Sequence, residues 1–342
     1  MILPGVLNTP TGRALVWFWA AVLGTLCSGA LVLQILGPPA PPSLKLVVAS
    51  SPAVASPPIK APPTPPARPQ RAPESPIAAP DPDMLDPATG LPRIAADGRM
   101  PMNVYAAGFD TTDRRPRVGL LLAGMGLNAA ETEEAIRVLP PSITLAFSPY
   151  AAQPMPLVEA ARAARHEFLI SLPLEPQGAP LNDAGNQALL TSAPTEQNQQ
   201  RLEWSLSRIS GYAGATGALG TLRGERFANT PELMAALLRD LAGRGLLYID
   251  PRPDAPHPNQ AWGRAIDVVI DDPPSRAELE ANLDRLEQLA RDRGSALGLA
   301  GTPTPLTVAR IAVWAAGLAY RGVALAPASA LVNPPPRAEP AR

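Results

Sequence analysis

Residues 117–140 read RVGLLLAGMGLNAAETEEAIRVLP, and the rest of the chain is best interpreted from this stretch. A continuous apolar run over residues 118–122 stops at a glycine turn, and apolar residues then recur at helical spacing up to Leu139. This change of pattern predicts a strand, a tight turn and a helix. In α/β proteins the loops after the carboxyl ends of strands hold ligands, so the turn is the first place to look for a site. The turn is Ala-Gly-Met-Gly (residues 123–126), which can neither exchange a proton nor bind a metal.

Downstream of this unit, strand-like and helix-like segments keep alternating, which is typical of a parallel sheet wrapped by helices. The expected strands lie at residues 143–147, 167–172, 213–222, 246–249, 266–270, 296–300 and 323–326. The expected helices lie at residues 156–164, 195–209, 230–244, 275–293 and 306–320. Seven or eight such units fit a barrel or a distorted barrel better than an open sheet. We therefore expect one α/β domain over residues 116–333.

Composition limits the size of this domain and the classes of function it can serve. The chain has 342 residues, but its 45 prolines are unevenly distributed and reduce the part that can pack into a core. Its 29 basic residues are balanced by 30 acidic ones, and no basic block interleaves with aromatic residues, so no nucleic-acid partner is expected. The single cysteine, Cys27, excludes an internal disulfide and a zinc site built from several cysteines.

An uncharged apolar stretch precedes the domain at residues 14–36. It is long enough to cross a hydrocarbon core of roughly 30 Å as a helix. Cleaved signal peptides have apolar cores of only about 7–15 residues, so an uncleaved membrane anchor is the better interpretation. We expect residues 1–13 to be a cytoplasmic tail and the remainder of the chain to be exported.

The stretch between the anchor and the domain, residues 37–115, is rich in proline, alanine and serine. It lacks the apolar periodicity on which a core forms, so it is predicted to be a disordered linker. Its last part, residues 91–110, regains apolar and aromatic residues and is expected to pack on the domain as an arm. The tail at residues 334–342 is again rich in proline and is expected to be disordered.

The domain also carries a series of short motifs. They are RVGLLLAGMG, TLAFSPY, ISLPLEP, RGERFAN, GLLYIDPRP, VVIDD, RGSALGLAGTP and RGVALAPASALV. In order and spacing they resemble the divergent polysaccharide deacetylase family over residues 117–332. The resemblance implies a β/α barrel of the glycoside hydrolase/deacetylase type, linked to carbohydrate metabolism. It also implies a bacterial inner-membrane protein whose domain lies in the periplasm.

Active members of that family are similar to metal-dependent hydrolases that remove acetyl groups from amino sugars. In them, a divalent metal held by carboxylate and imidazole activates water, and an aspartate acts as a base. This chain departs from that pattern. The Asp-Asp pair of the family is replaced by Ala123 and Gly124, and a histidine by Ser171. The Asn-His-Met-Gly motif aligns with residues 221–224 (Thr-Leu-Arg-Gly), and Gly-His-Pro with residues 301–303 (Gly-Thr-Pro). No resident metal or other cofactor is therefore expected.

The only two histidines, His166 and His257, fall at none of the aligned ligand positions. Each is expected to be a solvated loop histidine.

Carboxylates are the remaining candidates for chemistry. Asp250, Asp271 and Asp272 lie at the carboxyl ends of predicted strands and are the candidate catalytic residues, which can also hold a hard cation weakly. The alternative, which we favour, is that they cap the following helices or pair with arginine, Asp272 especially because its helix begins soon after at Ser275. The candidate substrate-binding residues are Ser171, Glu175, Arg223 and Arg252.

Three functions remain open at this point. The first is an inactive or weakened deacetylase-like envelope protein that binds cell-wall glycan or a protein partner. The second is an active carbohydrate N-deacetylase that uses Asp250, Asp271 and Asp272. The third is a dinucleotide-binding domain, because residues 124–129 match the G-x-G-x-x-A fingerprint. The third is the weakest, because the second strand ends at Ser148 without an acid for a ribose.

Overall fold

The computed structural model describes residues 18–19, 21–23, 76–253 and 255–335. The chain forms two units, residues 1–64 and 65–342, and the fold below is that of the second. No helix within the described ranges is both long and apolar enough to cross a membrane. All but five positions of the predicted span at residues 14–36 lie outside the described residues, as do residues 37–75 of the linker predicted at 37–115 and residues 336–342 of the tail predicted at 334–342.

In the described part of the second unit, nine strands form one sheet in which every pairing is parallel. The strands are β1 (Arg117–Met125), β2 (Thr144–Phe147), β3 (Phe168–Ser171), β4 (Gly214–Thr216), β5 (Leu247–Asp250), β6 (Gly263–Ala265), β7 (Val268–Val269), β8 (Ser295–Ala300) and β9 (Ala324–Leu325). Their order is β6-β5-β4-β3-β2-β1-β8-β7, and β9 lies beside the start of β1.

The two ends of the sheet meet on one short segment. β6 pairs with β5 and β7 pairs with β8, yet only Ile266 and Asp267 separate β6 from β7 along the chain. The Ile266 N–H donates to the Asp250 carbonyl (3.0 Å), and the Asp267 N–H donates to the Leu297 carbonyl (2.7 Å). The parallel sheet therefore curls back on itself. The expected β/α architecture with a parallel sheet is confirmed, and its curvature fits a distorted barrel.

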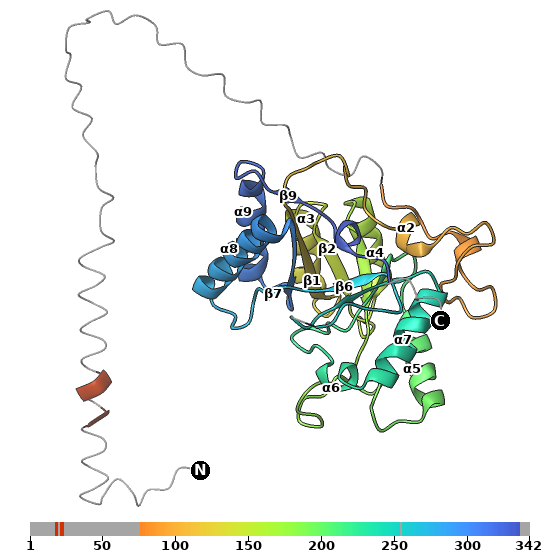
Figure 1. The fold of residues 1–342 in the computed structure, drawn as a ribbon. Coiled ribbons are helices and arrows are strands. Elements are labelled where there is room, and N and C mark those ends of the chain that lie inside the picture. Colours follow the sequence, from red (N-terminus) through yellow and green to blue (C-terminus); the bar gives the residue numbers. More distant parts are fainter. Residues whose placement is uncertain (1–17, 20, 24–75, 254, 336–342) are drawn as a thin grey trace, which may run out of the picture. The chain divides into compact units, whose positions relative to one another are not determined.

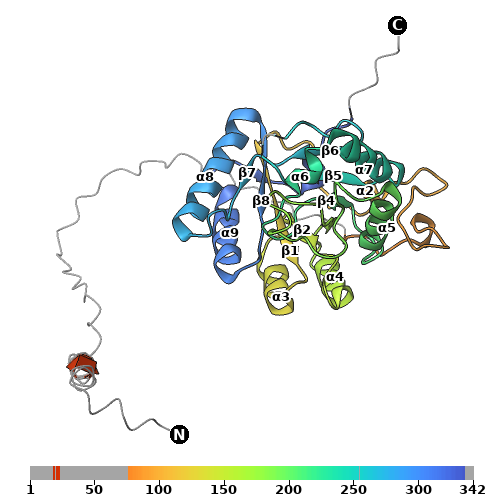
Figure 2. The same ribbon diagram turned by 90° about the horizontal axis from the view of Figure 1, so that it is seen from below.

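Helices follow most strands and lie around the outside of the curled sheet (Figure 2). They are α3 (Ala129–Val138), α4 (Pro154–Ala163), α5 (Thr195–Leu206), α6 (Glu225–Ala228), α7 (Pro231–Gly243), α8 (Arg276–Arg293) and α9 (Pro305–Leu318). The unit that opens the domain has the predicted form, because β1 leads through a turn into α3. Asn128 begins α3 by accepting a hydrogen bond from the Glu131 N–H (3.2 Å).

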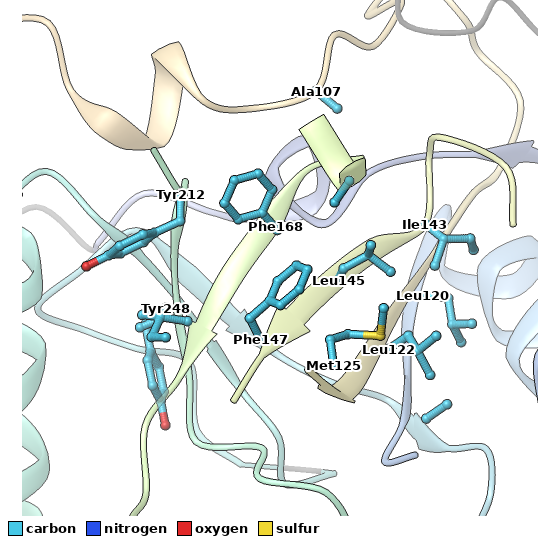
Figure 3. Packing of buried hydrophobic residues seen from close by; sticks show 14 of the residues in the cluster. Ala107, Leu120, Leu122, Met125, Ile143, Leu145, Phe147, Phe168, Tyr212 and Tyr248 are labelled. Atoms are coloured by element: carbon cyan, nitrogen blue, oxygen red, sulfur yellow. The ribbon is translucent and has the colours of Figure 1, made fainter. Parts of the chain in front are cut away.

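Successive strand residues separate into two buried clusters, because side chains alternate between the faces of a strand. Leu120 and Leu122 belong to the cluster that includes residues of the surrounding helices. Figure 3 shows this helix-side cluster, in which the rings of Phe147 and Phe168 meet edge to face with centroids 5.8 Å apart. Leu121, between the first two, belongs to a second cluster that contains no residue from α3 to α9 and fills the interior of the curled sheet.

Residues 76–110 cover the amino-terminal ends of the strands. This segment includes η2 (Pro82–Met84) and α2 (Pro101–Val104) (Figure 1). Met84 is fully buried, so buried contacts begin well before residue 91, where the sequence placed the start of the arm.

One buried carboxylate, Glu167, joins this covering segment to the rest of the domain. It accepts hydrogen bonds from the Ala107 N–H, the Thr144 hydroxyl and the Ser329 N–H, each 3.1 Å long. Ser329 lies in η3 (Ala328–Leu331), near the end of the domain. The donors thus come from three segments that are distant in the sequence.

Two details differ from the predictions. The glycine-rich strand expected at residues 213–222 is limited to the three residues of β4, and a turn follows it. His166 is fully buried rather than solvated, with Nδ1 2.9 Å from the Ile143 carbonyl and Nε2 3.3 Å from the Ile136 carbonyl. The chain turns sharply at Arg165 (φ 66°), so His166 is turned inward between α3 and β2. Burial lowers its pKa. His257, in contrast, is exposed as expected.

Candidate functional site

The loops after the carboxyl ends of β1, β4 and β8 meet at one mouth of the curled sheet. A Cβ placed on Gly124 would lie 2.8 Å from the Gly301 carbonyl oxygen, and one placed on Gly301 would lie 2.7 Å from the Gly220 carbonyl oxygen. Gly124 has a positive φ of 72°, which L side chains rarely adopt. The three loops thus approach one another through bare backbone.

This mouth is where the sequence aligned the missing ligands of the deacetylase pattern. Ala123 is buried on the interior face of β1, directly before Gly124. Thr302 follows Gly301, and its Cα would be 3.6 Å from a Cβ on Gly124. Neither alanine nor glycine offers a donor atom, and a threonine hydroxyl is a poor ligand for a transition metal.

Ser171 replaces the histidine of the pattern at the end of β3. It is fully buried, and its hydroxyl oxygen has no hydrogen-bond partner among the described residues. In β3 it alternates with Ile170 of the helix-side cluster and lies on the same face as Leu169 of the interior cluster. A single hydroxyl cannot take the place of an imidazole and two carboxylates as a metal-binding set.

A leucine fills the space next to these positions. Leu174 is 1% exposed, and its Cδ1 atom would lie 2.9 Å from a Cβ placed on Gly217. Its Cβ would overlap with one placed on Gly224. The side of the mouth between β3 and α6 is therefore apolar and closely packed.

Asp250 is buried and forms an ion pair with Arg252. The Arg252 Nη2 atom lies 2.7 Å from Oδ2 and Nε lies 2.9 Å from Oδ1, while the Arg252 N–H also donates to Oδ1 (3.1 Å). Arg252 Nη1 donates in turn to Asn229 Oδ1 (2.6 Å). Hydrogen bonding to Asp250 raises the pKa of Arg252. In β5, Asp250 shares a face with Tyr248 of the helix-side cluster, whereas Ile249 faces the interior. Asp250 and Arg252, both predicted site residues, therefore contact each other, but Asp250 lies on the face of β5 that points away from the interior of the sheet.

Asp271 faces the mouth, but its carboxylate already accepts hydrogen bonds from the backbone of the loop after β8. The Gly301 N–H lies 2.9 Å from both Oδ1 and Oδ2, and the Thr302 N–H donates to Oδ2 (3.1 Å). Asp271 is 5% exposed. Asp271 thus holds the loop after β8 in place. It neither caps a helix nor pairs with an arginine, which were the two roles favoured from the sequence.

We expect Asp271→Asn to lower the free energy of unfolding by about 2 kcal/mol, because the amide group can no longer accept both backbone N–H groups. Chemical denaturation of the full-length chain would measure this change. An unchanged denaturation midpoint would contradict the structural role, and Asp284→Asn on the exposed face of α8 is the matched control.

Asp272 is exposed and makes one weak ion pair, 3.3 Å from Arg223 Nη1. Arg223 also lies 3.4 Å from Glu225. Asp272 does not cap α8, since Ser275 does so by accepting the Glu278 N–H (3.2 Å). Of the two alternatives for Asp272, pairing with arginine is the one observed.

Glu175 holds the insertion that follows β3. Its Oε2 accepts hydrogen bonds from the Thr191 N–H and the Thr191 hydroxyl (2.6 Å each), and Oε1 lies 3.2 Å from Arg226 Nη1. Burial acts to raise the pKa of Glu175, but Thr191 and Arg226 outweigh it, and the net pKa lies below the ordinary value of 4.5. Nothing in the sequence pointed to Thr191 or Arg226, which come from two other segments.

Because the pKa of Glu175 is lower in the folded than in the unfolded state, its contribution to stability is present above pH 4.5 and is lost as the pH falls through the folded value. We expect the difference in unfolding free energy between the wild type and Glu175→Gln to shrink as the pH falls below 4.5. Denaturation curves at several pH values would test this. A difference that grows on acidification would contradict it.

The described residues contain no group of three or more His, Cys, Asp or Glu side chains placed to hold a metal ion. Asp250 and Asp271 are engaged by other groups, and Asp272 is in solvent, so the candidate catalytic residues do not form one free carboxylate site. The residues present do not fit the divalent metal that the family resemblance implies. A catalytic role for the three aspartates stays a prediction, and these contacts disfavour it.

One comparison with known proteins names a family for this chain. Residues 120–332 match the family model described as divergent polysaccharide deacetylase. The search of curated proteins found no match. Among solved structures, an uncharacterized protein from Agrobacterium tumefaciens C58 is 33% identical with a TM-score of 0.66, and the match covers 71% of this chain and 99% of that one.

Two further structures are more distant. A family 4 carbohydrate esterase from Streptomyces lividans in complex with acetate is 17% identical with a TM-score of 0.40, covering 61% of this chain and 91% of that one. The catalytic domain of a peptidoglycan N-acetylglucosamine deacetylase from Eubacterium rectale ATCC 33656 is 13% identical with a TM-score of 0.39, covering 62% of this chain and 88% of that one. On the family match and the likeness to the Agrobacterium protein, this chain belongs to the divergent polysaccharide deacetylase family.

Proposed function

We propose that this chain is a non-hydrolytic, glycan-recognising member of its family, tethered to the bacterial inner membrane and exposed to the periplasm. The observation that carries the proposal is the composition of the mouth. Alanine, glycine, serine and threonine stand at the aligned ligand positions, and the nearby Asp271 is engaged by backbone N–H groups. A site of this kind can exclude water and offer hydrogen bonds, but it has no group that activates water for attack on an amide.

Glycan is the proposed ligand because the family is named for polysaccharides and the scaffold is retained over residues 120–332. A protein partner in the envelope is the alternative ligand. The hydrolase alternative based on Asp250, Asp271 and Asp272 has no contact in its favour, since two of these carboxylates are buried in hydrogen bonds of their own.

Membrane attachment is proposed from sequence alone, from the uncharged stretch at residues 14–36. A proline-rich linker from residue 37 to about residue 75, extended at about 3.1 Å per residue, would place the domain on the order of 100 Å from the bilayer. Such a reach lets a tethered domain contact the cell wall. Protease treatment of cells with a permeabilised outer membrane would digest the domain if it is periplasmic and would spare it if it is cytoplasmic.

The binding function can be tested by sedimentation. The full-length chain in mild detergent would be mixed with purified peptidoglycan sacculi, with chitin and, as a matched polymer without N-acetyl groups, with cellulose. We expect the chain to sediment with sacculi and not with cellulose. No sedimentation with any N-acetylated polymer would contradict glycan recognition, and specific crosslinking to one envelope protein would then support the alternative.

A further inference from the structure

A groove lies on the outside of the curled sheet, between α8 and β7, with Asp272 at its edge. Its volume is about 360 Å³. No helix connects β5 to β6 along the chain, and a loop that includes Pro253 lines one part of the groove. The volume lies within the range of about 300–1,000 Å³ that is typical of small-ligand sites.

One face of α8 forms the wall of this groove. Asn282, Arg285, Leu289 and Arg293 line it, and their spacing of three, four and four residues places them on one side of the helix. Val268 of β7, a member of the helix-side cluster, provides an apolar floor. The groove therefore combines a short apolar strip with polar and cationic groups, as sites for sugars with a charged substituent require.

Two aspartates and two arginines line the groove, so its formal charges balance, and both carboxylates are already paired with arginine, since Asp272 pairs with Arg223 (3.3 Å) outside the lining. Asp267 at its end accepts from both Arg264 Nη2 (2.7 Å) and Arg293 Nη1 (3.3 Å), so two guanidinium groups share one carboxylate. Burial lowers the pKa of Arg264, and the nearby charge of Arg293 lowers it further. Arg285 is exposed in the groove and makes no ion pair or hydrogen bond within the described part of the chain.

A neutral acceptor lies on the same helix face. Asn282 donates through Nδ2 to the Ile270 carbonyl (3.3 Å), which fixes its amide and leaves Oδ1 without a donor among the described residues. A free guanidinium and a free amide oxygen lie one helical turn apart, on Arg285 and Asn282. This pair suits a ligand that presents a carboxylate and an N–H or hydroxyl donor.

We propose that this groove binds the carboxylate of an N-acetylmuramic acid unit, with Arg285 as the carboxylate partner and Asn282 accepting from the sugar. The choice of a muramic acid rather than an acidic peptide rests on the proposed function as a cell-wall glycan receptor. The groove would then select peptidoglycan over glycans built only from neutral sugars, because only a muramic acid carries the lactyl carboxylate.

The test compares two sugars that differ in this carboxylate. Isothermal titration of the full-length chain with N-acetylmuramic acid and with N-acetylglucosamine should show weaker binding of the second sugar. Arg285→Gln should weaken binding of N-acetylmuramic acid about tenfold or more, because it removes a charge-assisted hydrogen bond. Arg276→Gln is the matched control, since Arg276 lies on α8 outside the groove and is exposed.

Equal affinity for the two sugars, no binding of N-acetylmuramic acid, or the same affinity in wild type and Arg285→Gln would each overturn the assignment. A glutamate-containing peptide that binds as tightly as N-acetylmuramic acid would also overturn it. Chitin sedimentation of the wild type separates the two proposals. If the wild type sediments with chitin but does not bind N-acetylmuramic acid, then only the groove assignment fails.

Discussion

Replacing Glu167 by alanine is expected to lower the free energy of unfolding by about 3 kcal/mol. The variant leaves the N–H groups of Ala107 and Ser329 and the hydroxyl of Thr144 without their acceptor. The bonds from Ala107 and Thr144 are buried and the bond from Ser329 is partly buried, so water is a poor replacement for the carboxylate. Guanidinium chloride denaturation of the full-length chain measures the change.

Glu133→Ala is the matched control for this variant, because Glu133 is exposed on α3. It should change stability by less than about 0.5 kcal/mol. Burial raises the pKa of Glu167 above its ordinary value of 4.5, despite the hydrogen bonds it accepts. A raised folded pKa means that its contribution is fully present below pH 4.5 and declines as the pH rises. The stability of the wild type relative to Glu167→Gln should therefore fall as the pH rises from 4.5. Equal midpoints for Glu167→Ala and Glu133→Ala would contradict this account.

Restoring an acid of the deacetylase pattern, by Gly124→Asp, is expected to destabilise the domain by about 3 kcal/mol and not to create a metal site. Two effects add. The backbone at Gly124 has a φ of 72°, and the new Cβ would lie 2.8 Å from the Gly301 carbonyl oxygen. The loop after β8 would have to move, although Asp271 holds that loop in place by accepting hydrogen bonds from the N–H groups of Gly301 and Thr302.

Gly322→Asp separates the two effects. Gly322 has a similar φ of 76°, but a Cβ there would meet no atom within 4 Å. This control should cost only about 1 kcal/mol, the strain of the left-handed backbone. If Gly124→Asp is as stable as Gly322→Asp and retains zinc on dialysis, the mouth is more adaptable than its backbone contacts indicate.

Much of the fold could be predicted from the sequence because its signals are local. The strand, turn and helix of residues 117–140 have a clear change of period, and α8 and α9 are long enough for their periodicity to be unambiguous. The short elements β6 and α6 were missed, since three or four residues carry no period. β6 forms because this segment pairs with β5 and its next residues bond to β8. These contacts join residues far apart in the sequence, so no local pattern predicts them.

The sequence predicts which metal ligands are missing from the site better than it predicts the contacts that the remaining carboxylates make. The replacement of ligands at Ala123, Gly124 and Ser171 is visible in the sequence, and the structure adds that the loops there meet through bare backbone. The pairing of Asp250 with Arg252 follows from their closeness in the chain. The use of Asp271 by Gly301 could not be foreseen, because the partners are thirty residues apart and one of them is a main-chain N–H.

The most direct test of the central claim is the zinc bound per chain after equilibrium dialysis of the purified full-length protein, measured by mass spectrometry of the metal. With no carboxylate and imidazole set at the mouth, we predict that the wild type retains no more zinc than the Ser171→Ala variant. One zinc ion tightly held per wild-type chain, lost in Ser171→Ala, would contradict the account.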